Sequence, residues 1–129
     1  MPAAVIEVRR AYSRDEEVQL IEAVHAAMME GLKIPEWDKN VRLVVHEPHR
    51  FTSPPDKGDR YTLISIDLFE GRSIEAKRAL YKAVVERLEV LHIPRDHVKV
   101  LLRETARENW GVRGGVPASE VDLGFEVNV

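Results

Sequence analysis

The chain contains the same pattern twice, and this duplication limits the folds that it can adopt. The segment 8–13 aligns with 68–73, and the segment 41–47 aligns with 98–104. Each copy therefore reads as a strand, a helix and a second strand. Two such units in 129 residues predict one duplicated β-α-β architecture, because a repeated supersecondary unit buries its apolar face against its copy.

Local signals mark where the two helices begin and end. Ser13 and Glu16 form the S-x-x-E pattern of a capping box, and Ser73 stands at the equivalent position in the second copy. Apolar residues then recur at helical spacing in both copies. Pro35 and Pro94 lie just beyond the expected helix ends, where proline stops a helix.

Aliphatic and β-branched runs predict the strands. They cover residues 5–8, 41–45, 61–68 and 98–102. A further alternation of apolar residues over 121–129 predicts a C-terminal strand. We therefore expect an α+β fold, in which the duplicated units form a four-stranded sheet with two helices on one face, plus that C-terminal strand. The open face is expected to be strongly apolar and to require a partner copy, which predicts an oligomer.

We interpret the chain as a single domain, 1–129. The first β-α-β copy covers 1–47, a proline-rich loop covers 48–60, the second copy covers 61–104, and a C-terminal loop and strand cover 105–129.

Composition and charge argue against several classes of protein. The formal net charge is −3, so neither nucleic acid nor an anionic membrane is the expected partner. Cysteine is absent, and the five histidines lack metal-ligand spacing, so no disulfide or metal site is predicted. No apolar stretch approaches the length of about 18 residues of a membrane span, and no signal peptide is apparent, so we expect a cytoplasmic protein.

The second residue is proline, directly after the initiator methionine. Removal of Met1 would leave Pro2 with a secondary amine at the chain terminus. An α-amine has an ordinary pKa of about 7.7–8.0, and burial lowers that pKa into the range that suits proton transfer. The sequence therefore makes Pro2 a candidate acid/base group.

The duplicated topology brings distant residues to one end of the sheet. Strand one starts after Pro2, the parallel second strand starts after Asp38, and the antiparallel third strand ends before Arg72. The loop that carries Trp110 and Arg113 follows the fourth strand at the same end. Pro2, Asp38 and Arg72 are the candidate catalytic residues. Arg72 would bind a substrate carboxylate, with Trp110 and Arg113 as further substrate-binding candidates.

Structural roles remain open for the same residues. Arg72 could pair on the surface with Glu75 or Asp67, and Asp38 could be a simple turn residue. Trp110 could be a core aromatic, and Arg113 could contact a neighbouring subunit.

Taken together, these residues resemble the tautomerase superfamily. The stretches 68–73 and 108–114, together with Met1-Pro2, are most similar to its malonate semialdehyde decarboxylase-like long-chain group. The resemblance implies a homotrimer of tautomerase fold that acts on small carboxylates without a metal or organic cofactor. It maps the catalytic proline onto Pro2, an aspartate that directs water or the proline onto Asp38, and the carboxylate-binding arginine onto Arg72.

The chain departs from that pattern at one position. The resembling decarboxylases carry two arginines one residue apart, and Glu70 stands at the first of these positions. We therefore expect a cofactor-independent tautomerase of small enol or keto acids. A decarboxylase or hydratase of 3-oxo or unsaturated acids is the first alternative, and a non-catalytic, anion-binding trimeric scaffold is the second.

Overall fold

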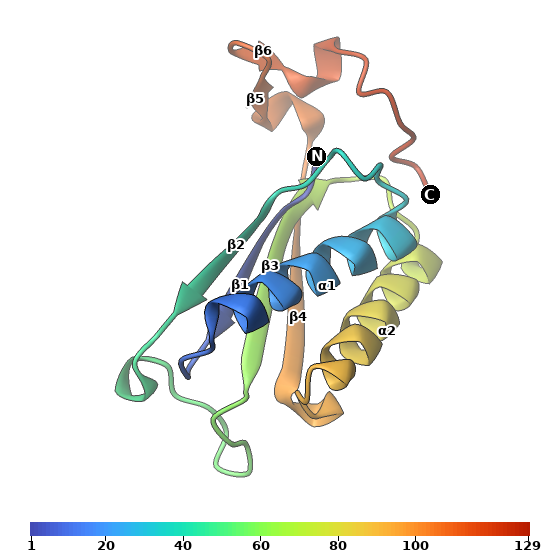
Figure 1. Ribbon diagram of the computed structural model, residues 1–129. Helices are drawn as coiled ribbons and strands as arrows, with labels where there is room; N and C mark the ends of the chain where they lie inside the picture. The colour runs from blue at the N-terminus through green and yellow to red at the C-terminus, as the bar shows by residue number, and fades with distance from the viewer.

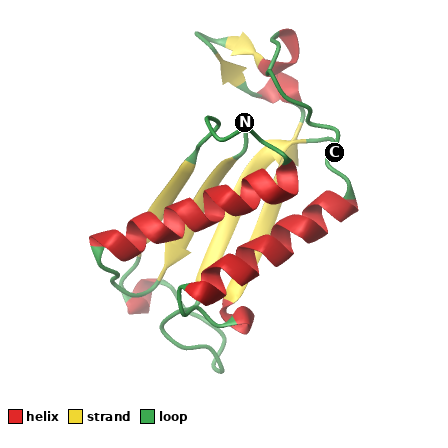
Figure 2. Ribbon diagram, turned by 45° about the vertical axis from the view of Figure 1, so that its right-hand side comes forward, coloured by secondary structure: helices red, strands yellow, loops and turns green.

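The computed structural model describes residues 1–129, in which two helices cover one face of a four-stranded sheet (Figures 1 and 2). The strands are β1 (Ala3–Val8), β2 (Val41–Val45), β3 (Thr62–Phe69) and β4 (Val98–Thr105), and the helices are α1 (Arg14–Leu32) and α2 (Ile74–Val90). The strand order is β2-β1-β3-β4. The two outer pairs run parallel and the central β1–β3 pair runs antiparallel, as the duplication predicts.

Both helices begin where their serine caps predict. The Ser13 amide donates to Glu16 Oε1 over 2.8 Å, and the Glu16 amide donates to Ser13 Oγ over 3.2 Å, which completes the capping box. Ser73 Oγ accepts from the Ala76 amide over 3.1 Å at the start of α2. Neither helix has the length and apolar character needed to cross a bilayer.

The main core lies between the sheet and the helices. Alternate residues of β1, namely Ala4, Ile6 and Val8, face the helices and are almost completely buried. The β1–β3 register sets Ile64 and Ile66 beside them. This alternation is the period-2 pattern that the sequence displays.

The two helices approach each other closely at Gly31. A Cβ atom at that position would lie 2.6 Å from the Cα of Leu80 in α2, so only glycine permits this approach. Gly31 is one residue from the end of α1, and its packing therefore also positions the turn that follows.

The open face of the sheet is more polar than predicted. Val44 and Leu101 are exposed there, but β2 and β4 also bring charged residues to this face. Arg103 makes a two-pronged contact with Asp67, from Nε to Oδ1 at 2.8 Å and from Nη2 to Oδ2 at 3.2 Å. The expectation of a strongly apolar face was wrong, because strand alternation places Arg42 on this side as well.

The predicted C-terminal strand was also wrong. After β4 the chain forms a short hairpin of β5 (Gly111–Val112) and β6 (Val116–Pro117), and residues 121–129 form no strand. Single-turn 3₁₀ helices occupy Pro48–Arg50, Arg95–His97, Arg107–Asn109 and Ala118–Glu120. The apolar alternation instead buries Leu123 and Val127 against Phe69, and no neighbouring strand pairs with this segment.

Candidate active site

Four segments that are distant in sequence meet at the end of the sheet where the N-terminus lies (Figure 1). Ala3 pairs with Asp67 at the start of β1, and the Ala4 amide donates to the Asn40 carbonyl beside β2. The chain terminus therefore lies between the turn before β2 and the end of β3. The segment after β4 closes the same end of the molecule.

Asp38 forms an ion pair with the chain terminus. The amine nitrogen of Met1 lies 3.2 Å from Asp38 Oδ2, and Asp38 is only 4% exposed. Its other oxygen, Oδ1, accepts from Asn40 Nδ2 over 3.3 Å. The Asp38 amide also donates to the Pro35 carbonyl, so Asp38 does belong to a turn, but its carboxylate is directed at the amine.

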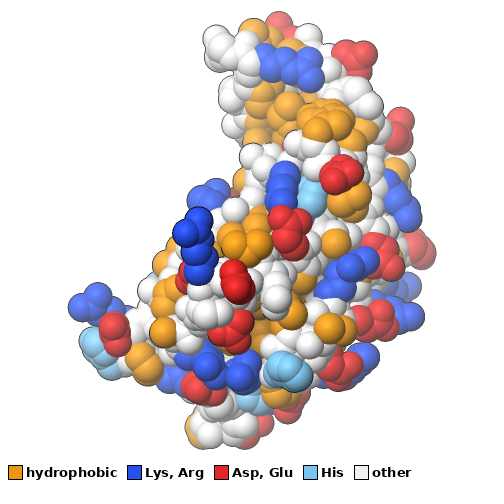
Figure 3. All heavy atoms as spheres, viewed as in Figure 1, with side chains coloured by type: hydrophobic (Ala, Val, Ile, Leu, Met, Phe, Trp, Pro, Cys, Tyr) orange, Lys and Arg blue, Asp and Glu red, His pale blue; other side chains and the backbone are white.

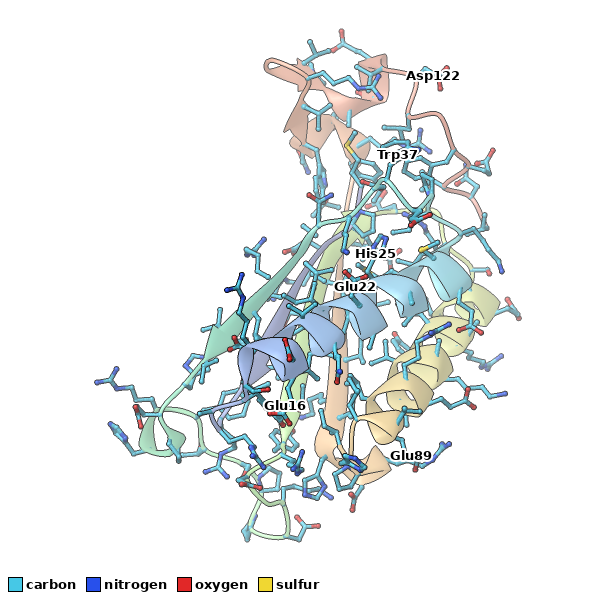
Figure 4. The ribbon with its side chains drawn as sticks, viewed as in Figure 1. Glu16, Glu22, His25, Trp37, Glu89 and Asp122 are labelled. Carbon is cyan, nitrogen blue, oxygen red and sulfur yellow. The ribbon has the colours of Figure 1, made fainter.

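His25 of α1 contacts the turn that contains Asp38. The imidazole is 3% exposed, and its Nε2 lies 3.0 Å from the Glu36 carbonyl, which can only accept a hydrogen bond. Figure 4 shows His25 and Trp37 near this end of the sheet, whereas Glu16 and Glu89 lie toward the other end. Trp37 is exposed and meets Phe125 edge-on at 6.0 Å. This contact of His25 has no signal in the sequence.

The environment of the amine favours its neutral form. Burial lowers the pKa of the Met1 amine below its ordinary value, and this effect outweighs the charge of Asp38, which raises that pKa. The charges of Arg72 and Arg107 lower it further. Pro2 is buried directly behind Met1. Removal of Met1 would make the nitrogen of this buried residue the amine of the chain terminus.

Arg72 is a buried cation with free donors. It is 5% exposed, its Nη1 donates weakly to the Phe69 carbonyl over 3.5 Å, and its Nε and Nη2 have no hydrogen-bond partner. Burial, followed by the charge of Arg107, lowers its pKa. The proposed surface pairing with Asp67 does not occur, since Asp67 is bound to Arg103. Gly71, with φ of +129°, makes the turn that directs Arg72 inward.

A second, smaller apolar cluster forms a wall beside these charges. Phe69 is completely buried, and its ring meets Trp110 edge-on at 4.9 Å. The indole N–H of Trp110 donates to Thr105 Oγ1 over 2.6 Å. The other members of this cluster are Ala118, Leu123 and Val127, with Met1 packed against it. Figure 3 shows hydrophobic side chains gathered toward the hairpin end. Trp110 is therefore both a packed aromatic and part of the wall.

Arg113 and Glu70 lie apart from the charged cluster. Arg113 is exposed in the hairpin turn, at a φ of 46°, and no hydrogen bond or ion pair joins it to Asp38 or Arg72. Glu70 is exposed beyond the end of β3. No group of His, Asp or Glu side chains is placed to hold a metal ion.

The structure adds Arg107 to the cluster. Its guanidinium carbon lies 5.9 Å from the centre of the Phe69 ring. Arg107 is the first residue of a 3₁₀ turn, and the Trp110 amide donates to its carbonyl. This turn therefore fixes the positions of both residues relative to each other. From the sequence, either Arg107 or Arg113 could substitute for the arginine that is missing at Glu70, and the structure brings Arg107 to Phe69.

The hollows on the surface of a single chain lie elsewhere. A groove between α1 and α2, lined by Val18, Ala23, Ala26, Val90 and Leu91 among others, has a volume of about 470 Å³. A smaller one beside Tyr12 and His92 has a volume of about 110 Å³. Neither includes the amine, Asp38 or Arg72, so a single chain does not enclose the charged cluster in a pocket.

Comparison with known proteins connects this cluster to a family. A family model described as tautomerase enzyme matches residues 38–113. A protein of Ralstonia nicotianae named "Probable tautomerase" is 41% identical over 58 residues, which cover 44% of this chain and 81% of that protein. A 2-hydroxymuconate tautomerase of Comamonas testosteroni is 39% identical over 57 residues, covering 43% of this chain and 89% of that protein.

Solved structures show the same fold over nearly the whole chain. Malonate semialdehyde decarboxylase superposes with a TM-score of 0.78 at 23% identity, covering 87% of this chain and 92% of that one. A fused 4-OT described as a symmetric trimer superposes with a TM-score of 0.76 at 22% identity, covering 91% of this chain and 96% of that one.

Proposed function

This chain belongs to the tautomerase enzyme family, and from that premise we propose that it moves a proton on small enol or keto carboxylic acids, with Pro2 as the acid/base group after removal of Met1. The observation that carries the proposal is the guanidinium of Arg72. It is buried, yet its Nε and Nη2 have no partner in the chain. Two free donors on a buried cation match the two oxygens of a carboxylate.

The geometry supports a simple division of roles. Arg72 holds the substrate carboxylate, and the wall of Phe69 and Trp110 excludes water from one side. The neutral Pro2 nitrogen accepts the proton of the enol hydroxyl, and the resulting ammonium returns a proton to the neighbouring carbon, which yields the keto acid. We assign to Asp38 the role of orienting the Pro2 amine and stabilising its charged form between the two transfers, because its carboxylate pairs with the adjacent Met1 amine in the unprocessed chain.

Processing of Met1 controls this activity, since a retained methionine converts the Pro2 nitrogen into an amide without basicity. We expect the species that lacks Met1 by intact mass to ketonise 2-hydroxymuconate, and the full-length species to show at most about 1% of that rate. Treatment of the full-length species with methionine aminopeptidase provides the control, because it should restore turnover. A processed enzyme that turns over no member of a panel of enol acids would contradict the proposal.

The pH dependence separates the base role from an acid role. Burial lowers the pKa of the Met1 amine, and we expect the neighbouring Pro2 amine, which belongs to a buried residue, to shift in the same direction, so that its neutral form is populated below the ordinary value of about 8. A base must be neutral, so kcat/KM should rise with pH through that pKa, with a midpoint below 8. If the rate instead falls with rising pH over the same range, the ammonium is the reactive form.

That opposite outcome corresponds to the second candidate function, a decarboxylase or hydratase. Two observations favour it as the alternative: the structural likeness to malonate semialdehyde decarboxylase and the 3.2 Å ion pair between the Met1 amine and Asp38, whose carboxylate would also stabilise an ammonium on the neighbouring Pro2. In that case activity on 3-oxo acids would depend on Asp38.

The proposed assembly is a homotrimer. The fused 4-OT with the same fold is described as a trimer, Val44 and Leu101 are exposed on the open sheet face, and a single chain does not enclose the charged cluster. We expect light scattering at micromolar concentration to give about three times the 14.7 kDa chain mass. A monomer under these conditions would contradict this proposal and leave the site without a closing partner.

A further inference from the structure

We propose that Arg107 is a second anion-binding residue of this site and that it selects acids with two carboxylates over acids with one. The inference rests on the proposed function, because it takes Arg72 to hold the first carboxylate. Arg107 is not one of the residues onto which the resemblance to the tautomerase superfamily maps a role.

The position of Arg107 is set by Phe69. The guanidinium carbon of Arg107 lies 5.9 Å from the centre of the Phe69 ring, and Arg72 Nη1 lies 3.5 Å from the carbonyl of the same residue. Met1 packs against the cluster that contains Phe69. Two guanidinium groups and the chain terminus are therefore arranged around one buried aromatic residue.

The two arginines lack an ion-pair partner within the chain. Neither Arg72 nor Arg107 takes part in an ion pair, whereas Asp38 is paired with the amine at 3.2 Å. The nearby Glu104 is paired with Lys77 at 2.6 Å, and Glu126 accepts from the backbone amides of residues 127 and 128. Burial, and after it the like charge of Arg107, lowers the pKa of Arg72, and these effects outweigh the charges of Asp38 and Glu104, which raise it.

This balance of charge points to a dianion. After the amine and Asp38 offset each other, two half-buried or buried cations remain without partners. A ligand with one carboxylate satisfies Arg72 and leaves Arg107 unpaired, whereas a second carboxylate satisfies both. Glu70 at the end of β3 is exposed and supplies no cation, and the second cation near Phe69 is Arg107 from the segment after β4.

Binding of two non-reacting acids of equal length tests the inference without requiring turnover. Calorimetry should show succinate binding to the Met1-processed protein about tenfold more tightly than butyrate. Arg107→Gln should abolish this preference by weakening succinate alone. Arg87→Gln, which removes an exposed arginine of α2, is the matched control and should change neither affinity.

The outcomes separate this inference from the proposed function. Equal affinity of the protein with Arg107 intact for succinate and butyrate would overturn the inference. An equal loss of affinity for both acids in Arg107→Gln would also overturn it, because such a loss indicates a nonspecific effect of the positive charge. Failure of enol acid turnover with the succinate preference intact would instead overturn the catalytic proposal and leave a dianion-binding site.

Discussion

Replacement of Arg72 by methionine is expected to abolish activity while leaving the fold at least as stable. The guanidinium is 5% exposed with Nε and Nη2 unpaired, so the folded chain carries the cost of burying them. Each such unsatisfied donor costs about 1–3 kcal/mol, and methionine fills a similar volume without that cost. We expect Arg72→Met to raise the free energy of unfolding by about 1 kcal/mol and to lower kcat/KM about 10²–10³-fold.

Urea unfolding and steady-state kinetics on the same preparation measure the two effects. Arg72→Lys is the control, because it keeps the charge but lacks the planar pair of donors, so a smaller loss of activity is expected. A variant Arg72→Met that is strongly destabilised would assign Arg72 a structural role. Full activity in that variant would remove it from substrate binding.

Replacement of Gly31 by alanine is expected to destabilise the protein by about 2–3 kcal/mol. Alanine favours a helix over glycine by about 1 kcal/mol, but here its Cβ would lie 2.6–2.7 Å from the Cα, Cβ and N atoms of Leu80. These are mostly backbone atoms, so rotation of a side chain cannot relieve the contact. The helices must separate instead, which also disturbs the turn that holds Asp38.

The midpoint of urea unfolding measures this effect. Gly111→Ala is the matched control, because a Cβ there meets no atom within 4 Å, and it should change stability by less than about 0.5 kcal/mol. Shortening Leu80 to alanine in the Gly31→Ala background should not restore stability, since the clashing backbone atoms remain. A neutral Gly31→Ala variant would show that the helices can separate at little cost.

The sequence was sufficient to predict the sheet and the end of the sheet at which Asp38, Arg72 and the chain terminus meet. Ser13, Ser73 and the two prolines act locally, so the ends of the helices could be inferred without tertiary information. The duplicated units then fix the strand directions, and the directions bring Asp38 and Arg72 beside the chain terminus. This reasoning needed only the connectivity of the strands.

Predictions that depended on tertiary packing were less successful. The alternation over residues 121–129 is real, but it serves burial of Leu123 and Val127 against Phe69 rather than strand pairing. The sequence did not distinguish Arg107 from Arg113 as the substitute for the missing arginine, because the approach of Arg107 to Phe69 depends on the 3₁₀ turn after β4. The polar open face is a different case, since strand alternation itself places Arg42, Asp67 and Arg103 there, and the prediction of an apolar face did not follow that alternation residue by residue.

The internal duplication has a consequence for stoichiometry. Since Ser13 corresponds to Ser73, Tyr12 occupies in the first copy the position that Arg72 occupies in the second. Tyr12 carries a phenol, and the guanidinium of Arg10, 4.8 Å from its ring, approaches Asp59 at 3.6 Å, so the first copy has no buried guanidinium with free donors at the position equivalent to Arg72. Two structural repeats thus provide one reactive amine, and a covalent label for that amine would saturate at one equivalent per chain.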